Sequence, residues 1–177
     1  MVRYRRNFVP GGTFFFTVTL RDRRSSVLVD HVDLLRNAFR RTRGALPFDV
    51  HAIVVLPEHL HTIWTLPPSD ADFSARWRKI KGAFSRSVGE AGLTLERDPR
   101  GEYDLWQRRF WEHTVRDIDD LRRCMDYIHY NPVKHGWATS PANWKLSSLH
   151  RYIREGTLPP DWGGNGAAIE GDFGEPV

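Results

Sequence analysis

Two histidines separated by one residue, His59 and His61, have a type and spacing that could do chemistry. Side chains two positions apart on a β-strand share a face, so both imidazoles would project side by side. Two neutral imidazoles placed in this way can bind one divalent ion and leave positions open for a substrate. The pair alone also fits an ordinary strand edge, so the pattern needs a third ligand. Glu58 is a weaker ligand candidate, because it would point to the opposite face from His59.

A tyrosine and an amide one helical turn apart, Tyr127 and Asn131, form the second candidate group. Residues four apart lie on one side of a helix, so the amide oxygen could bind the same ion while the phenolate acts as a nucleophile. A cation would favour the phenolate, because the ordinary pKa of a tyrosine is about 10. Tyr130 is the rival nucleophile but faces away from Asn131, and His129 is predicted to be structural.

Four segments are predicted to be strands. Residues 13–20 are β-branched and aromatic, which is typical of a buried strand. Strands at about 48–55 and 59–66 flank the turn Pro57-Glu58 and are predicted to form a hairpin. A fourth strand at about 109–115 leads into the helix that carries the tyrosine.

Three helices are predicted to pack on these strands. Asp30 can cap the first, which runs to about Arg43 and ends at Gly44. The second covers about 71–89 after a cap at Asp70. The third begins at Asp117 and ends near Asn131, because Pro132 disfavours helical geometry in the residue before it.

The apolar positions of the three helices recur at helical spacing. They are Val32, Leu35, Ala38 and Phe39; Phe73, Trp77, Ile80 and Phe84; and Ile118, Leu121, Met125 and Ile128. Tyr127 projects about 110° from the centre of the last stripe, which predicts that it lies outside the core. The order of strands and helices indicates an α+β fold, a ferredoxin-like sandwich with a central antiparallel sheet and helices on one face. The tyrosine helix and an irregular C-terminal extension, with a short helix at about 147–154, are added to it.

The distribution of charge favours a polyanionic partner. The net charge is +4, and removing the three acidic residues of segment 163–177 leaves +7 for the first 162 residues. Aromatic residues make up 12% of the chain, and arginine with tryptophan and tyrosine suits phosphate contacts and base stacking. The Gly-rich acidic segment 163–177 is predicted to be disordered. A lone Cys124 fits a reducing cytoplasm, and no apolar run is long enough to span a bilayer.

Both candidate groups resemble motifs of one enzyme family. The segment His59-Leu60-His61 resembles the signature of HUH endonucleases, and the run from Tyr127 through Asn131-Pro132-Val133 to Gly136 resembles the tyrosine motif of the REP-associated tyrosine transposases. Two further blocks support the resemblance, Val54–His59 and Leu105–His113. The resemblance covers about residues 3–155, so we expect one domain over 1–155 and a Gly-rich acidic tail over 156–177.

The resemblance implies a fold, a site and a reaction. The fold is the ferredoxin-like sandwich, and His59, His61 and Asn131 would hold one divalent metal, Mg²⁺ or Mn²⁺. Tyr127 would attack a single-stranded DNA phosphate and form a 5′-phosphotyrosine bond. The substrates would be hairpin-forming repetitive extragenic palindromes (REPs), and the protein would be cytoplasmic, a monomer or a homodimer. Insertion-sequence relatives carry glutamine where Asn131 stands here, and the shorter amide still supplies an oxygen.

Basic residues in three places are the candidate DNA contacts. They are Arg3, Arg5 and Arg6 in an N-terminal arm, Arg76, Lys79 and Lys81 on the second helix, and Arg108 and Arg109 before the last strand. Trp106, Trp137 and Trp144 could stack on unpaired bases, although core packing is expected for at least two of them. Two alternatives stay open, a DNA-hairpin binder that does not cut and a metal phosphodiesterase that uses water. The second would need more ligands near His59 and His61 than the sequence offers.

Overall fold

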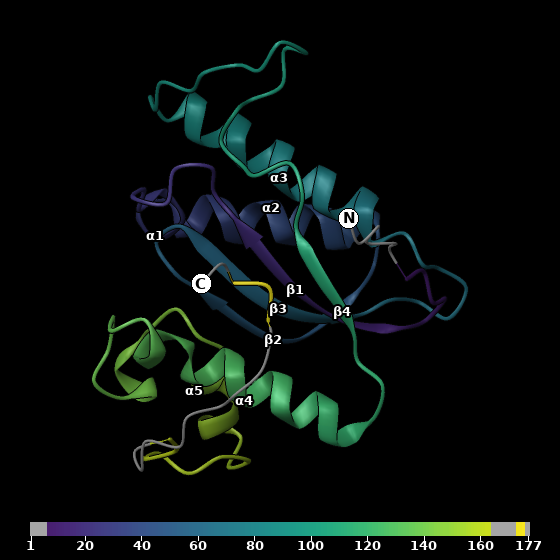
Figure 1. Ribbon diagram of the computed structural model, residues 1–177, viewed down its shortest axis with the longest axis vertical. Coiled ribbons are helices and arrows are strands. Elements are labelled where there is room, and N and C mark those ends of the chain that lie inside the picture. The colour runs from purple at the N-terminus through teal and green to yellow at the C-terminus, as the bar shows by residue number, and fades with distance from the viewer. Residues whose placement is uncertain (1–6, 164–172, 176–177) are drawn as a thin grey trace, which may run out of the picture.

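Strand β1 lies inside a four-stranded antiparallel sheet because its central residues are apolar towards both faces. The computed structural model describes residues 7–163 and 173–175. Its strands are β1 (Thr13–Thr19), β2 (Asp49–Val55), β3 (His59–Thr65) and β4 (Trp111–Thr114), in the spatial order β2-β3-β1-β4 (Figure 1). Phe14, Phe15 and Phe16 on β1 are all fully buried. The predicted hairpin is confirmed, since β2 pairs with β3 around the turn at residues 56–58.

One face of the sheet is covered by the helices that the ferredoxin-like sandwich requires. These are α1 (Val27–Asp30), α2 (Val32–Ala45) and α3 (Phe73–Glu90). Phe73, Trp77, Ile80 and Phe84 of α3 are buried as predicted, and they share a core with Phe14, Phe16 and Trp64 of the sheet. The cap of helix α3 is Asp72, whose carboxylate accepts the amide N–H of Ala75, and not the predicted Asp70.

The tyrosine helix α4 (Ile118–Lys134) crosses the opposite face of the sheet (Figure 1). A second core forms there, in which Cys124, Tyr127 and Ile128 pack on Phe15 and Ile63. Alternation along β3 places Leu60 in the first core and Ile63 in the second. His59 and His61 therefore face α4, which brings the two predicted groups together.

Two predicted helix ends are wrong. Gly44 does not end its helix, because α2 continues to Ala45. The segment before α2 forms a separate short helix, α1. Pro132 does not end α4 either, since the helix continues to Lys134. Proline removes one N–H donor but its fixed φ is compatible with a helix. The carbonyl of Pro132 accepts the N–H groups of Trp137 and Ala138, which close the end of the helix.

The extension after α4 returns along the free edge of β2. It contains η1 (Pro141–Asn143) and α5 (Leu149–Arg154). The N–H of Val55 donates to the carbonyl of Leu146 at 2.9 Å, and the N–H of Ser148 donates to that of Ile53 at 2.8 Å. These bonds cover part of the β2 edge.

The prediction of disorder over 163–177 is wrong for its described residues 173–175. Phe173 is buried against Phe15 and Tyr127. Gly174 has a φ of +69°, and a side chain there would overlap Trp111. This close approach fits only glycine at that position. The described helices include none with the length and apolar character needed to cross a membrane.

Candidate active site

His59 and His61 lie side by side on β3, with ring centroids 4.9 Å apart. Both side chains are buried in the space between the sheet and α4. Each ring is fixed through its Nδ1 atom, His61 by the hydroxyl of Thr17 at 2.8 Å and His59 by the carboxylate of Glu58 at 2.9 Å. Both Nε2 atoms therefore point into the site, as metal-binding imidazoles do when a second group orients them.

The hydrogen bonds of Thr17 determine the tautomer of His61. The Thr17 hydroxyl donates its one proton to the carbonyl of Phe173 at 2.6 Å, so it must accept from the Nδ1–H of His61. Complete burial lowers the pKa of His61 to about 4, which leaves the ring neutral near pH 7. The Nε2 atom of His61 then carries a free lone pair.

Glu58 acts on His59 and not as a ligand in its own right. Burial favours the neutral acid, but the hydrogen bond and charge of His59, with Arg23 at 3.3 Å, lower the pKa of Glu58. Burial likewise favours neutral His59, but the carboxylates of Glu175 and Glu58 beside the ring outweigh it and raise the pKa of His59. The placement of Glu58 behind His59 agrees with its poor geometry as a ligand.

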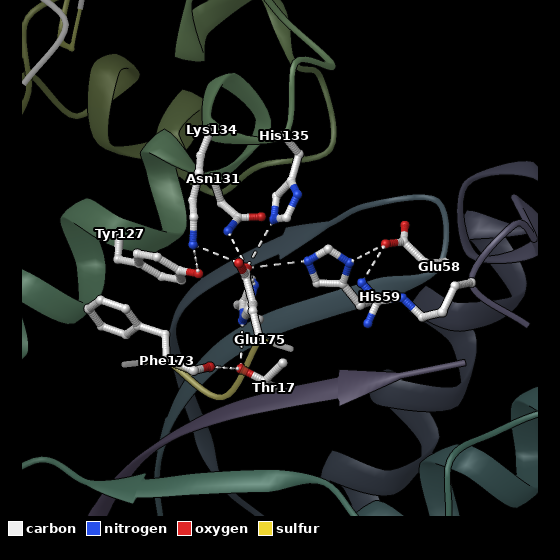
Figure 2. A network of polar contacts seen from close by, with 11 residues as sticks. Thr17, Glu58, His59, Tyr127, Asn131, Lys134, His135, Phe173 and Glu175 are labelled. Carbon is white, nitrogen blue, oxygen red and sulfur yellow. Dashed lines mark hydrogen bonds and ion pairs between the residues drawn. The ribbon is translucent and has the colours of Figure 1, made fainter. Parts of the chain in front are cut away.

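A carboxylate from the C-terminal segment, Glu175, lies at the centre of the site (Figure 2). Its Oε1 atom is 2.7 Å from His61 Nε2, 3.6 Å from His59 Nε2 and 2.7 Å from the amide nitrogen of Asn131. Lys134 Nζ lies 2.7 Å from Oε2, and His135 Nε2 lies 3.1 Å from Oε1. Burial acts to raise the pKa of Glu175, but the neighbouring imidazoles of His135, His59 and His61 lower it far below its ordinary value.

The donor set fits a divalent ion. His61, His59 and Glu175 offer three ligand atoms within 4.8 Å of one another. His59 Nε2 and the Asn131 side-chain oxygen are buried without a hydrogen-bond partner. A neutral Nε2 lone pair 2.7 Å from a carboxylate oxygen is stable only with a shared cation or proton. Imidazole nitrogen with amide and carboxylate oxygen is a set that binds borderline and hard divalent ions.

Tyr127 lies directly against the histidines, with its ring centroid 5.3 Å from that of His61. Lys134 donates from Nζ to the Tyr127 hydroxyl at 2.8 Å, and the ring of Phe173 stacks on the Tyr127 ring (Figure 2). Its side chain is only 2% exposed, so the prediction that Tyr127 lies outside the core is wrong. The helix buries the face around Cys124, Tyr127, Ile128 and Asn131, whereas Ile118 is 59% exposed.

Two other residues of α4, the alternative nucleophile Tyr130 and the predicted structural residue His129, lie away from the histidine pair. Tyr130 packs beside Gly163 instead of the histidines. His129 is buried, bonds to the Ser148 hydroxyl at 3.1 Å and has its pKa lowered by burial to about 4. Tyr127 is therefore the tyrosine that meets the histidine pair.

Sequence reasoning missed four residues of the site. They are Thr17, Lys134, His135 and Glu175. Lys134 and His135 follow Asn131 by three and four residues. On a helix this spacing places them on the same side as Asn131, so the sequence does indicate that they lie near the site. Thr17 is an inward residue of a strand with no distinctive neighbours. No local pattern marks Glu175, because its partners are distant in the sequence.

The predicted DNA contacts have mixed outcomes. Arg76 is 1% exposed and bonds to Asp70 and to the carbonyls of Pro47 and Asp72, so it anchors the start of α3 and cannot reach DNA. Lys79, Arg108 and Arg109 are exposed, and Lys81 donates to the carbonyl of Gln107 at 2.9 Å. Arg3, Arg5 and Arg6 lie outside the described residues.

The three tryptophans suggested for base stacking also differ. Trp106 is buried in the first core, and Trp144 is partly buried and donates to the Val55 carbonyl at 2.9 Å. Trp137 is 51% exposed, two residues after His135. The expectation that at least two of the three are packed agrees with this arrangement.

A second cluster, His113, Asp120 and Cys124, joins β4 to α4. His113 Nε2 lies 2.8 Å from Asp120, and Arg123 and Arg116 lie 2.6 Å and 3.4 Å from the same carboxylate. Burial raises the pKa of Cys124 to about 12, so its thiol stays protonated. These partners satisfy Asp120 and make the cluster an anchor for α4.

Known proteins are similar to this chain in both sequence and fold. Over residues 15–131 the chain matches the family described as IS200-like transposases. A REP-associated tyrosine transposase of Escherichia coli K12 is 46% identical over 165 residues, which cover 93% of each chain. A Haemophilus influenzae protein of the same group is 41% identical over 176 residues, covering 98% of this chain and 100% of that one.

A solved structure, described as a REP-associated tyrosine transposase bound to a REP hairpin, has the same fold. It matches with a TM-score of 0.82 and 44% identity, over 99% of this chain and 94% of that chain. The sheet, the histidine pair and the tyrosine helix thus define a transposase of the IS200-like class. The chain belongs to the REP-associated tyrosine transposases within that class. The predicted fold class and family are confirmed.

Proposed function

We propose that this chain cuts and rejoins single-stranded DNA through a covalent bond between Tyr127 and a 5′-phosphate. The observation that carries the proposal is the meeting of the Tyr127 ring with His61 of the same chain, 5.3 Å between ring centroids. A nucleophile beside a cationic group and metal-ligand residues is the arrangement that covalent phosphoryl transfer needs. Because one chain supplies both groups, the proposed reaction takes place within a single subunit.

The reaction forms one bond and breaks one. The Tyr127 oxygen loses its proton and bonds to phosphorus. The bond from phosphorus to the 3′-oxygen breaks, and that oxygen takes up one proton and leaves as a 3′-hydroxyl. Rejoining is the reverse attack by a 3′-hydroxyl, which needs no ATP because the phosphotyrosine conserves the phosphodiester. Lys134 holds the tyrosine oxygen by a charge-assisted hydrogen bond of 2.8 Å, which favours the phenolate over the phenol.

His59, His61 and Asn131 would hold one divalent ion, Mg²⁺ or Mn²⁺. When bound, the ion supplies positive charge that polarises the phosphate. Thr17 and Glu58 keep both imidazoles oriented towards it. The described site would also offer Glu175 as an oxygen ligand, unless the substrate takes its place.

The proposed substrate is a hairpin-forming REP in the DNA of the cytoplasm. The support is the relative of known structure that is bound to a REP hairpin and shares 44% of its sequence with this chain. Lys79, Arg108 and Arg109 are exposed cations that could contact its phosphates. Residues 1–155 would form the catalytic domain and 156–177 its tail.

A labelled single-stranded hairpin oligonucleotide with Mn²⁺, analysed on a denaturing gel, tests the reaction. We expect a covalent protein–DNA species that Tyr127→Phe abolishes and the matched control Tyr130→Phe retains. Cleavage that survives Tyr127→Phe, without a covalent species, would mean that water is the nucleophile.

A hairpin-binding regulator that does not cut is the second candidate. The presence of Glu175 and Phe173 in the site favours it, because these side chains occupy space that a substrate phosphate needs. Tight hairpin binding with no covalent species in Mg²⁺ or Mn²⁺, with or without residues 173–177, would support this candidate.

A further inference from the structure

The carboxylate of Glu175 marks where the two free oxygens of a scissile phosphate can lie. A carboxylate and a phosphodiester are both anions that present two oxygens to hydrogen-bond donors and cations. Oε1 lies 2.7 Å from His61 Nε2, at the end of the site that holds the proposed metal ligands. Oε2 lies 2.7 Å from Lys134 Nζ, which also holds the Tyr127 hydroxyl at 2.8 Å. The proposed nucleophile is therefore at the Oε2 end of the carboxylate.

His135 contacts the other end of the carboxylate. Its Nε2 atom lies 3.1 Å from Oε1 of Glu175, and its ring meets that of His59 with centroids 5.1 Å apart. An ionised carboxylate only accepts hydrogen bonds, so His135 donates from Nε2. Figure 2 shows Tyr127 on one side of the carboxylate and His135 on the other. A proton donor thus lies across the carboxylate from the proposed nucleophile.

This arrangement matches the direction of a displacement at phosphorus, in which the attacking and leaving oxygens are roughly in line. A phosphate that replaces the carboxylate and is attacked by Tyr127 directs its 3′-oxygen to the opposite side, where His135 lies. That oxygen needs a proton to leave as a hydroxyl, because an alkoxide is a far stronger base than the attacking phenolate. His135 offers an N–H group where the departing oxygen is expected.

The other described side chains that contact the Glu175 carboxylate already have tasks in the proposed reaction. They are His59, His61 and Asn131, the proposed metal ligands, and Lys134, which holds the nucleophile. The side chain of His135 is 26% exposed, whereas those of His59 and His61 are 2% and 0% exposed. The His135 ring can therefore exchange a proton with water between turnovers. The end of α4 fixes its position, since its backbone N–H donates to the Asn131 carbonyl at 3.1 Å.

We propose that His135 donates a proton to the 3′-oxygen that leaves during cleavage, an inference that rests on the function proposed above. The electron pair of the bond from phosphorus to the 3′-oxygen moves to that oxygen, which takes the Nε2 proton of the His135 imidazolium. The products at this end are a 3′-hydroxyl and a neutral imidazole. In rejoining, the same Nε2 atom accepts the proton of the attacking 3′-hydroxyl, because a general acid acts as the base in the reverse direction.

A sulfur atom at the cut bond tests this role at a single pH. One hairpin oligonucleotide has the natural 3′-oxygen at that bond, and a second has sulfur in its place. A thiolate leaves without a proton, because a thiol ionises with a pKa of about 8.5, as cysteine does, far below that of an alcohol. The readout is the single-turnover rate of covalent adduct formation with Mn²⁺, measured on denaturing gels.

We expect His135→Ala to form the adduct about 10²- to 10⁴-fold more slowly on the oxygen substrate, the usual contribution of general acid catalysis. On the sulfur substrate it should match the unsubstituted protein. His135→Gln keeps an N–H donor that can hold a phosphate but cannot transfer its proton, so it should behave like His135→Ala. The matched control is His31→Ala, because His31 caps α2 on the other face of the sheet, and both of its rates should be unchanged. Circular dichroism melting establishes that each variant is folded.

A loss of equal size on both substrates would overturn the proposal, because the leaving oxygen would then not be the atom that His135 serves. Full activity of His135→Gln on the oxygen substrate would also overturn it, since His135 would only hold the phosphate. Weaker Mn²⁺ binding by His135→Ala in calorimetric titrations, with equal losses on both substrates, would make His135 a metal ligand instead.

The cleavage proposal is decided separately by the unsubstituted protein. A Tyr127 adduct on either substrate supports cleavage, whatever the His135 variants do. An adduct on both substrates at the same rate in His135→Ala contradicts the role of His135 alone. The absence of an adduct on both substrates in the unsubstituted protein contradicts cleavage and, with it, the proton transfer.

Discussion

The ring of Phe173 lies flat on the ring of Tyr127, with centroids 3.6 Å apart and ring planes at 13°. Two residues later, the carboxylate of Glu175 lies between the side chains of His59, His61 and Asn131. The proposed nucleophile and the proposed metal ligands are thus covered by three consecutive residues of the same chain. A substrate phosphate carries negative charge and must take the place of the Glu175 carboxylate.

Removal of residues 173–177 should accelerate formation of the covalent adduct on a hairpin oligonucleotide. A competing contact of about 1.4 kcal/mol corresponds to a tenfold change in rate, and we expect a gain of at least that size. Single-turnover kinetics on denaturing gels measure it. Phe173→Ala and Glu175→Gln separate the two contacts, and a slower adduct in Glu175→Gln with weaker Mn²⁺ binding would instead make Glu175 a metal ligand.

Lys134 should matter to the chemical step, because its ammonium holds the Tyr127 oxygen at 2.8 Å. Lys134→Met keeps the length of the side chain and removes the charge, and we expect adduct formation to fall about 10²-fold, as when one charge-stabilising donor is lost. Lys134→Arg should recover part of the rate. Unchanged single-turnover rates in Lys134→Met, with DNA binding intact, would contradict this role.

Glu58 should influence metal binding through His59. Its carboxylate accepts from His59 Nδ1 at 2.9 Å, and loss of such an orienting partner typically weakens metal affinity 10- to 100-fold, roughly. We expect Glu58→Ala to weaken Mn²⁺ binding within that range in calorimetric titrations, and Glu58→Gln to weaken it less, because an amide oxygen still accepts the bond. Equal affinity in all three proteins would show that His59 needs no such partner.

Asp120 should stabilise the fold in a pH-dependent way. Burial acts to raise the pKa of Asp120, but hydrogen bonds from the backbone of Arg116 and from His113 and Arg123 outweigh it and lower that pKa. A carboxyl with a lowered folded-state pKa contributes stability that is present above its unfolded pKa of about 3.9, and this stability is lost as the pH falls further.

Asp120→Asn should therefore lower the free energy of unfolding by ~2 kcal/mol at pH 7, the usual loss for a hydrogen bond to a charged group. Urea denaturation from pH 7 to pH 3 should show the difference shrinking below about pH 4. Asp119→Asn is the matched control, since its side chain is 87% exposed and pairs only weakly with Arg122. A difference that is constant with pH would exclude the carboxylate as its source.

Local periodicity explains which parts of the site could be predicted. The alternation of a strand places His59 beside His61, and the spacing of a helix places Tyr127 beside Asn131. His59 and His61 do lie side by side, Tyr127 and Asn131 are both on the buried side of α4, and β2 pairs with β3. Each depends on residues within one element or one turn.

Tertiary contacts explain what could not be predicted. Arg76 is buried because backbone carbonyls of Pro47 and Asp72 accept its protons, and no sequence pattern announces such acceptors. The burial of Tyr127 follows from its packing on Phe15 and Phe173, residues on different segments of the chain. Glu175 meets His61 across 114 positions, a separation at which local pattern carries no information.

Helix α4 continues unbroken through Pro132, so one rigid rod carries Tyr127, Asn131 and Lys134. Each residue of an α-helix turns the chain by about 100°. A single insertion or deletion between Tyr127 and Asn131 would swing one of them away from the histidines, even if the helix kept its stability. Insertions and deletions should therefore be absent between Tyr127 and Asn131 in proteins that keep this function. They should be tolerated in the 91–104 loop, because a change of length there does not alter the direction in which the α4 side chains point.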